Sequence, residues 1–149
     1  MSDDRHLRGL ERLYARAPIN RLFPSTLRLL AAGRSEIRFR IEEVHFHAAG
    51  AAHGSLYFKM LDDAAFYAAN SMVEDHFVLT TQFNLVLTRP VAAGEHVATG
   101  QWVSGARRVL IAESRLLTAD GEEVARGTGT FMRSRIPLAS LPGYAEAPA

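Results

Sequence analysis

The sequence predicts an α+β domain in which one antiparallel sheet curls around a single long helix. Two observations predict it. Residues 55–71 are almost wholly apolar and lack strand-like alternation, which favours a long buried helix. Strand-like runs precede this segment, and four consecutive runs follow it. An antiparallel sheet wrapped around a central helix fits that order, because each element must bury its apolar surface against the other.

Length and composition indicate one domain spanning 1–149. Of the 149 residues, 48% are hydrophobic and 22% are charged, as in ordinary soluble globular proteins. The formal net charge is +1 and basic residues are scattered, which argues against a nucleic-acid surface. There is no cysteine, so disulfides, thiolate metal sites and a cysteine nucleophile are excluded. We find no signal-peptide core and no apolar run of about 18 residues, so we expect a cytoplasmic protein without a membrane segment.

Residues 1–25 are expected to form an N-terminal helical extension. Acids at its start suit a helix N-terminus, and Pro18 ends the helix near Ala17. The apolar residues at helical spacing are Leu7, Leu10, Leu13 and Tyr14. Residues 27–31 then predict a short strand. The alternation from Ile37 predicts a half-buried strand over 37–46.

After the central helix, the runs 78–88, 96–104, 109–118 and 124–132 predict four strands. Short glycine-containing segments between the last three are hairpin signals. The domain core is therefore expected over about 26–135. The segment 137–149 contains three prolines and is expected to be a loose tail.

The polar residues of the central helix fall into two groups on a helical wheel. Lys59, Asp63 and Asn70 form one narrow stripe, which we interpret as the solvated edge of the helix. Asp62 lies off that stripe, beside the apolar flank. A carboxylate there needs a hydrogen-bond partner, a neighbouring subunit or a substrate cleft. Alternatively, Asp62 merely widens the polar edge or caps a nearby loop.

These residues also resemble a family. His53-Gly54-Ser55, followed by Asp62 nine residues after the histidine, is similar to the hotdog thioesterases of the phenylacetate-degradation (PaaI-like) type. The segments 67–71 and 80–84, with Arg89-Pro90 beyond them, resemble the helix end and the next strand of that family. The resemblance covers about 27–133. It implies a hotdog fold and hydrolysis of an acyl-CoA to free acid and CoA.

The resemblance implies a role for each of four catalytic candidates. Gly54 offers a backbone N–H to the oxyanion, as unpaired N–H groups at a helix N-terminus do well. Asp62 acts as general base or nucleophile, which the sequence does not distinguish. Thr80 helps to hold the attacking water. His47 stands where the family has asparagine, so it donates a comparable hydrogen bond, acts as a second acid or base, or marks different chemistry.

Four further residues are candidates for substrate binding. Ser55 replaces the second glycine of the motif and adds a hydroxyl near the site. His53 holds the turn by hydrogen bonds or contacts the substrate. Arg107 and Arg108, in a hairpin turn, are candidates for the phosphates of coenzyme A. We expect no metal, since the pair His45 and His47 lacks a third ligand, and no separate cofactor, because CoA is part of the substrate.

The spacing of Gly54 and Asp62 makes a structural demand. Eight helical residues separate them by about 12 Å along the axis, too far for one thioester carbon to meet both. The family solves this with a two-fold dimer that shares its sites, so we expect a homodimer or a dimer of dimers. Two alternatives stay open: a hotdog hydratase or dehydratase, and a non-catalytic acyl-CoA-binding module.

Overall fold

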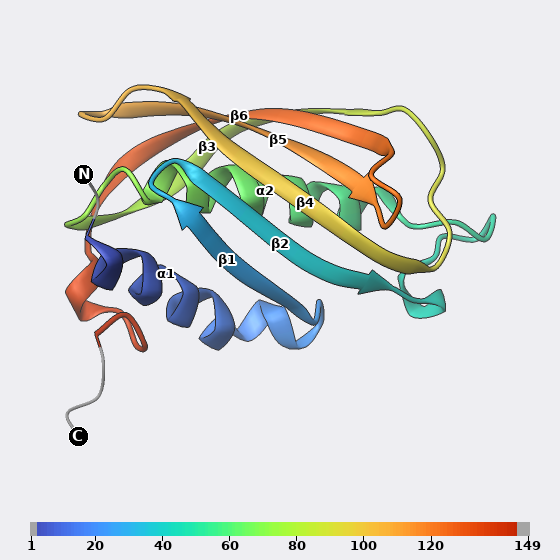
Figure 1. The fold of residues 1–149 in the computed structure, drawn as a ribbon, viewed down its shortest axis with the longest axis horizontal. Coiled ribbons are helices and arrows are strands. Elements are labelled where there is room, and N and C mark those ends of the chain that lie inside the picture. The colour runs from blue at the N-terminus through green and yellow to red at the C-terminus, as the bar shows by residue number, and fades with distance from the viewer. Residues whose placement is uncertain (1–2, 146–149) are drawn as a thin grey trace.

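The structure, a computed structural model, describes residues 3–145. Within these residues, six strands form one antiparallel sheet in the order β1-β2-β4-β5-β6-β3. Figure 1 shows the sheet curved around helix α2 (Gly54–Asn70), with helix α1 (Asp4–Arg16) on the outside beside β1. This arrangement confirms the predicted α+β hotdog class with an N-terminal helix.

The remaining elements follow the predicted order. Before α2 come η1 (Pro18–Arg21), β1 (Ser25–Ala31), β2 (Arg34–Ile41) and η2 (Glu43–His45). After α2 come β3 (His76–Leu87), β4 (Gly94–Ser104), β5 (Val109–Thr118), β6 (Glu123–Pro137) and η3 (Leu138–Ser140).

The largest differences from the predicted boundaries lie at two places. The strand expected over 37–46 ends at Ile41, because Glu42 and His45 form a reciprocal capping box that turns the chain into η2. The expected loose tail is packed as far as Tyr144. Strand β6 continues to Pro137, Leu138 is fully buried and the Tyr144 hydroxyl lies 2.7 Å from Nδ1 of His6. Residues 146–149 lie outside the described part.

Helix α2 sits unusually close to the sheet at Gly100 on β4. A Cβ at this position would overlap the backbone carbonyl of Ala64 on α2. The Ser35 hydroxyl of β2 donates a 2.5 Å hydrogen bond to the same carbonyl. Ala64 and its neighbours Ala65, Ala68 and Ala69 are fully buried. Small residues on both elements therefore fix how α2 lies along the strands.

The prediction that Lys59, Asp63 and Asn70 form a solvated edge is wrong at Lys59. Its ammonium pairs with Asp63, donates to Oδ1 of Asn20 at 2.6 Å and lies over the rings of Tyr14 and Phe23. Burial raises the pKa of Asp63, and the nearby Lys59 charge opposes that rise. The N-terminal extension thus covers this edge of α2.

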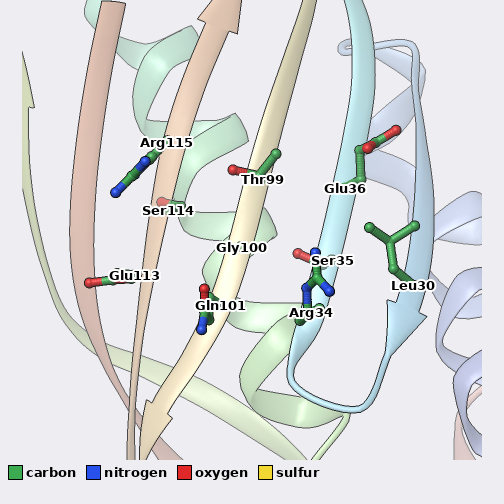
Figure 2. Close-up of a pocket in the computed structure, with 10 residues that line it drawn as sticks. All are labelled: Leu30, Arg34, Ser35, Glu36, Thr99, Gly100, Gln101, Glu113, Ser114 and Arg115. Atoms are coloured by element: carbon green, nitrogen blue, oxygen red, sulfur yellow. The ribbon is translucent and has the colours of Figure 1, made fainter. Parts of the chain in front are cut away.

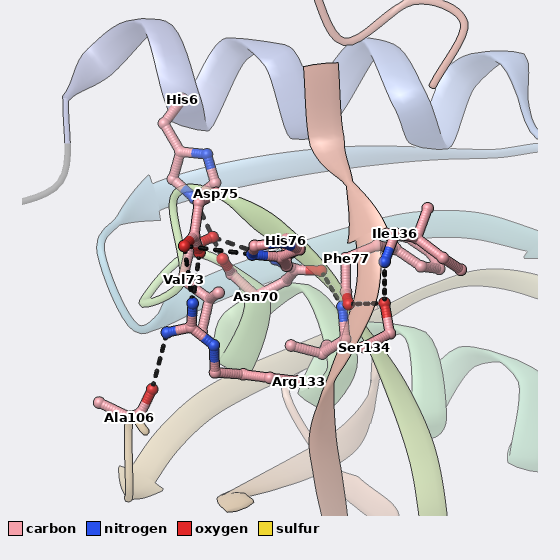
Figure 3. Close-up of polar contacts among 11 residues, drawn as sticks. His6, Asn70, Val73, Asp75, His76, Phe77, Ala106, Arg133, Ser134 and Ile136 are labelled. Atoms are coloured by element: carbon pink, nitrogen blue, oxygen red, sulfur yellow. Dashed lines mark hydrogen bonds and ion pairs between the residues drawn. The ribbon is translucent and has the colours of Figure 1, made fainter. Parts of the chain in front are cut away.

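The prediction is also wrong at Asn70, which is fully buried at the C-terminal end of α2. Its amide donates to the backbone carbonyls of Val73 and His76, and its Oδ1 accepts the N–H of Val78. Figure 3 shows this end of the molecule, where Nε2 of His6 also donates to the Asn70 carbonyl at 3.0 Å. Asn70 therefore joins the helix end to β3.

We expect Lys59→Met to lower the free energy of unfolding by about 2 kcal/mol, because it leaves the largely buried Asp63 carboxylate without its cation. Urea denaturation measures this. The double variant Lys59→Met/Asp63→Leu should recover most of the loss. Arg40→Ala, which breaks an exposed pair with Glu95, should cost under about 0.5 kcal/mol. A Lys59→Met effect no larger than that of Arg40→Ala would contradict the prediction.

Candidate active site

Helix α2 runs antiparallel along β3, which is one of the two edge strands of the sheet. Three contacts fix the alignment, and all use one stripe of the helix. The pairs are Asp62 with Thr80 (Oδ1 to Oγ1, 2.9 Å), Phe58 with Phe83 (ring centroids 5.5 Å apart), and Gly54 with Leu87, whose Cδ1 would lie 4.0 Å from a Cβ on the glycine. Helix positions i, i+4 and i+8 therefore follow the edge strand from one end to the other.

Asp62 lies at one end of this stripe and is largely buried. Burial raises its pKa to about 6. The hydrogen bond from Thr80 opposes that rise, the neighbouring Asp63 adds to it, and Lys59 opposes it. A carboxyl group whose pKa lies near neutrality is suited to proton transfer at the pH of a cell.

Gly54 lies at the other end of the stripe, as the first residue of α2. The Ser55 N–H donates to Nδ1 of His53 at 3.0 Å, and the Leu56 N–H donates to the His53 carbonyl at 3.0 Å. Among residues 3–145, the Gly54 N–H has no acceptor. Since Gly54 does not have a positive φ, the backbone itself does not require glycine here. The free N–H lies at the positive end of the helix dipole and is available to an anionic oxygen.

His53 is the N-cap of α2. Its Nδ1 accepts the Ser55 N–H and also lies 2.9 Å from the Ser55 hydroxyl. Because Nδ1 accepts, the neutral ring carries its proton on Nε2. His53 and Ser55 therefore organise the turn that presents the Gly54 N–H.

His47 is exposed in the turn between η2 and α2. Its Nδ1 accepts the N–H of Ala49 at 3.0 Å, and its carbonyl accepts the N–H of Gly50. It does not line the hollow at the N-terminal end of α2, whereas His45 does. Sequence reasoning considered His45 only as a metal ligand. The turn made by η2 therefore places His45, and not His47, in the hollow beside α2.

Arg107 and Arg108 lie in the turn between β4 and β5, near the C-terminal end of α2. The Arg108 carbonyl accepts the N–H of Arg133, whose guanidinium binds both carboxylate oxygens of Asp75 at 2.7 Å (Figure 3). In one chain, this turn lies at the end of the helix opposite Gly54. The structure therefore does not bring these arginines together with Gly54, His53 and Ser55 within a single subunit.

The hollow drawn in Figure 2 lies on the outer face of the sheet, away from this site. Its volume is about 320 Å³, and strands β2, β4 and β5 lie between its outward side chains and α2. Four of its ten lining residues are charged: Arg34, Glu36, Glu113 and Arg115. Neither Asp62 nor Thr80 lines this hollow or any of four others found in residues 3–145.

Neither a metal cluster nor a membrane span is found in the described residues. No group of three or more histidine, aspartate and glutamate side chains in residues 3–145 is placed to hold a metal ion. No helix in the same range has the length and apolar character needed to cross a membrane.

Comparison with known families gives a match over this region. The sequence model of the thioesterase superfamily matches residues 49–125, which include Gly54, Asp62 and Thr80. The chain belongs to the thioesterase superfamily. A search of curated proteins gives no match.

Solved structures agree with membership of the thioesterase superfamily. PaaI of Escherichia coli, from the phenylacetic acid degradation operon, is 16% identical with a TM-score of 0.83, over 92% of this chain and 99% of that one. A thioesterase family protein of Silicibacter pomeroyi is 26% identical with a TM-score of 0.75, over 84% and 97%. A phenylacetic acid degradation-related protein of Ralstonia eutropha is 24% identical with a TM-score of 0.73, over 84% and 98%.

Proposed function

We propose that this chain hydrolyses acyl-CoA thioesters to the free acid and CoA. The observation that carries the proposal is the arrangement of one stripe of α2. Asp62, whose pKa is about 6, lies at one end of this stripe, and the unpaired Gly54 N–H lies at the other end. Asp62 acts as general base toward water or as nucleophile toward the carbonyl carbon. The Gly54 N–H stabilises the negative charge that develops on the carbonyl oxygen.

The two groups of one chain do not meet at one carbonyl, since eight helical residues separate them by about 12 Å. Two chains can bring these groups together if they associate through the unpaired edge of β3. If two β3 edges pair antiparallel about a two-fold axis beside Asn84, the Thr80 end of one strand lies against the Leu87 end of the other. Asp62 of one subunit then lies near Gly54 of the partner subunit, which gives two equivalent sites.

The exposed surface along this edge supports the dimer. Phe58 is 42% exposed and Leu87 is 48% exposed, although both are large apolar side chains. Phe58 lies midway between Gly54 and Asp62, where a two-fold axis would bring it toward its counterpart. An unpaired edge strand with apolar neighbours favours association with another strand.

The experiment is free-thiol release from short, aromatic, medium and long acyl-CoAs. Turnover of one acyl class supports the proposal and gives its substrate range. No turnover by the wild type, with acyl-CoA still bound in calorimetry, would instead identify a non-catalytic acyl-CoA-binding module. Hydration of an enoyl-CoA without thiol release would identify a hotdog hydratase.

The pH dependence follows from Asp62. Because the ionised carboxylate is the active form and its pKa is about 6, kcat/KM should rise with pH through about 6 and then level off. Thr80→Val removes the hydrogen bond that lowers this pKa, so its midpoint should move to higher pH. Initial rates between pH 4.5 and 9 measure both midpoints. A wild-type profile without a midpoint near 6, or a variant midpoint at lower pH, would contradict this assignment.

A further inference from the structure

A hollow of about 390 Å³ adjoins the first turn of α2. It is lined by Leu22, Phe23, Val44, His45, Phe46, His53, Ser55 and Leu56. The N-terminal extension supplies one wall, the η2 region supplies the second and α2 supplies the floor. The rings of Phe23 and His45 stack with an interplanar angle of 14°.

The position of this hollow relates it to the carbonyl site. Its lining includes His53 and Ser55, the two residues that flank Gly54. A thioester whose oxygen accepts the Gly54 N–H has its carbonyl carbon within about 4 Å of that nitrogen. Because the hollow is lined by the residues on both sides of Gly54, it is within reach of one of the two groups on that carbon, the acyl chain or the sulfur with its pantetheine arm.

The lining favours the acyl chain over the pantetheine arm. Five of the eight lining side chains are apolar, and Val44 and Leu22 stand at the rim with 82% and 69% of their surface exposed. Pantetheine carries two amides, each of which needs hydrogen-bond partners when it is buried. The Nδ1 atoms of both imidazoles already accept backbone N–H groups, from Glu42 to His45 and from Ser55 to His53, so neither is available to accept an amide N–H of pantetheine. An apolar acyl group needs no hydrogen-bond partner when it is buried there.

We infer that this hollow receives the acyl group of the substrate and selects compact apolar acyl groups. The inference rests on the proposed thioesterase function and names the part of the chain that sets its substrate range. A volume of about 390 Å³ is at the small end of ligand sites, which suits a short or medium acyl chain or a single ring. The N-terminal extension is then a specificity element, since Leu22 and Phe23 line the hollow.

The test places a carboxylate at the rim. Val44→Asp and Leu22→Asp are compared with Leu30→Asp, an exposed apolar position on β1 outside the hollow. With hexanoyl-CoA, each rim variant should raise KM roughly tenfold while kcat changes little. With acetyl-CoA, whose methyl group barely enters the hollow, kcat/KM should stay within about twofold. Leu30→Asp should match the wild type with both substrates.

Binding separates this inference from the proposed function. In the Asp62→Asn background, calorimetry should show weaker hexanoyl-CoA binding on adding Val44→Asp, and unchanged binding of free CoA. Weaker binding of free CoA would overturn the inference, because the hollow would then hold the pantetheine arm. Equal KM for hexanoyl-CoA in all variants would also overturn it, with the thioesterase function intact. If no acyl-CoA is hydrolysed but the rim variants bind hexanoyl-CoA more weakly, the result supports the acyl-binding hollow and contradicts the proposed thioesterase function.

Discussion

Asp62→Asn should lower kcat for acyl-CoA hydrolysis by about 10²–10⁴-fold with little change in KM. The amide neither accepts a proton from water nor attacks a carbonyl, and removal of a positioned general base costs this much. Free-thiol release at pH 8 measures the loss, because Asp62 is ionised there in the wild type. Asp63→Asn is the matched control at the next position. A kcat within threefold of the wild type in Asp62→Asn would exclude Asp62 as base or nucleophile.

The same variant should keep or gain stability, which separates lost chemistry from lost folding. Burial raises the pKa of Asp62 from 3.8 to about 6, so the folded state disfavours its charge. This penalty is absent well below pH 3.8, grows between pH 3.8 and about 6, and is complete above about 6. Asp62→Asn should therefore raise the free energy of unfolding at pH 8, by up to about 3 kcal/mol. Urea denaturation at pH 8 and at pH 4 should show a much larger gain at the higher pH.

Gly54→Pro should lower kcat by about 10²–10³-fold, whereas Gly54→Ala should change it by less than about threefold. Proline removes the proposed oxyanion donor without breaking a hydrogen bond of the helix, since it suits the first position of a helix. His53 has φ −66° and ψ 145°, the extended conformation that a residue before proline adopts. Alanine keeps the N–H, and its Cβ would make an ordinary 4.0 Å contact with Leu87.

Mixing the two inactive variants then tests whether the site is shared. In a dimer of one Asp62→Asn chain and one Gly54→Pro chain, one site carries both lesions and the other carries none. Random association should restore about one quarter of wild-type activity. The control is each variant taken through the same mixing procedure without the other variant. No recovery in dimers shown by mass spectrometry to be mixed would place Asp62 and Gly54 of one site in the same chain.

The sequence by itself determined the class of fold and the location of the candidate site. The largely apolar segment from 55 to 71 predicted α2 to within a residue at each end. A helix that is buried on nearly every side has apolar residues on nearly every face, so its sequence is apolar throughout. Alternation and turn residues placed the strands. The family resemblance gave the superfamily that the match over residues 49–125 then showed. These features are local in the chain, so sequence carries them.

Only the tertiary structure decided what surrounds the helix. Lys59 and Asn70 have the wheel positions of solvated residues. Asn20 and Phe23, distant in sequence, nevertheless cover Lys59, and His6, equally distant, contacts Asn70 together with Val78 of the next strand. The same holds for Asp62, whose raised pKa depends on burial beside Thr80 on a different element. Periodicity shows which residues share a face of a helix. It does not show which distant segment covers that face, and that segment sets the dielectric and the hydrogen bonds on which the chemistry depends.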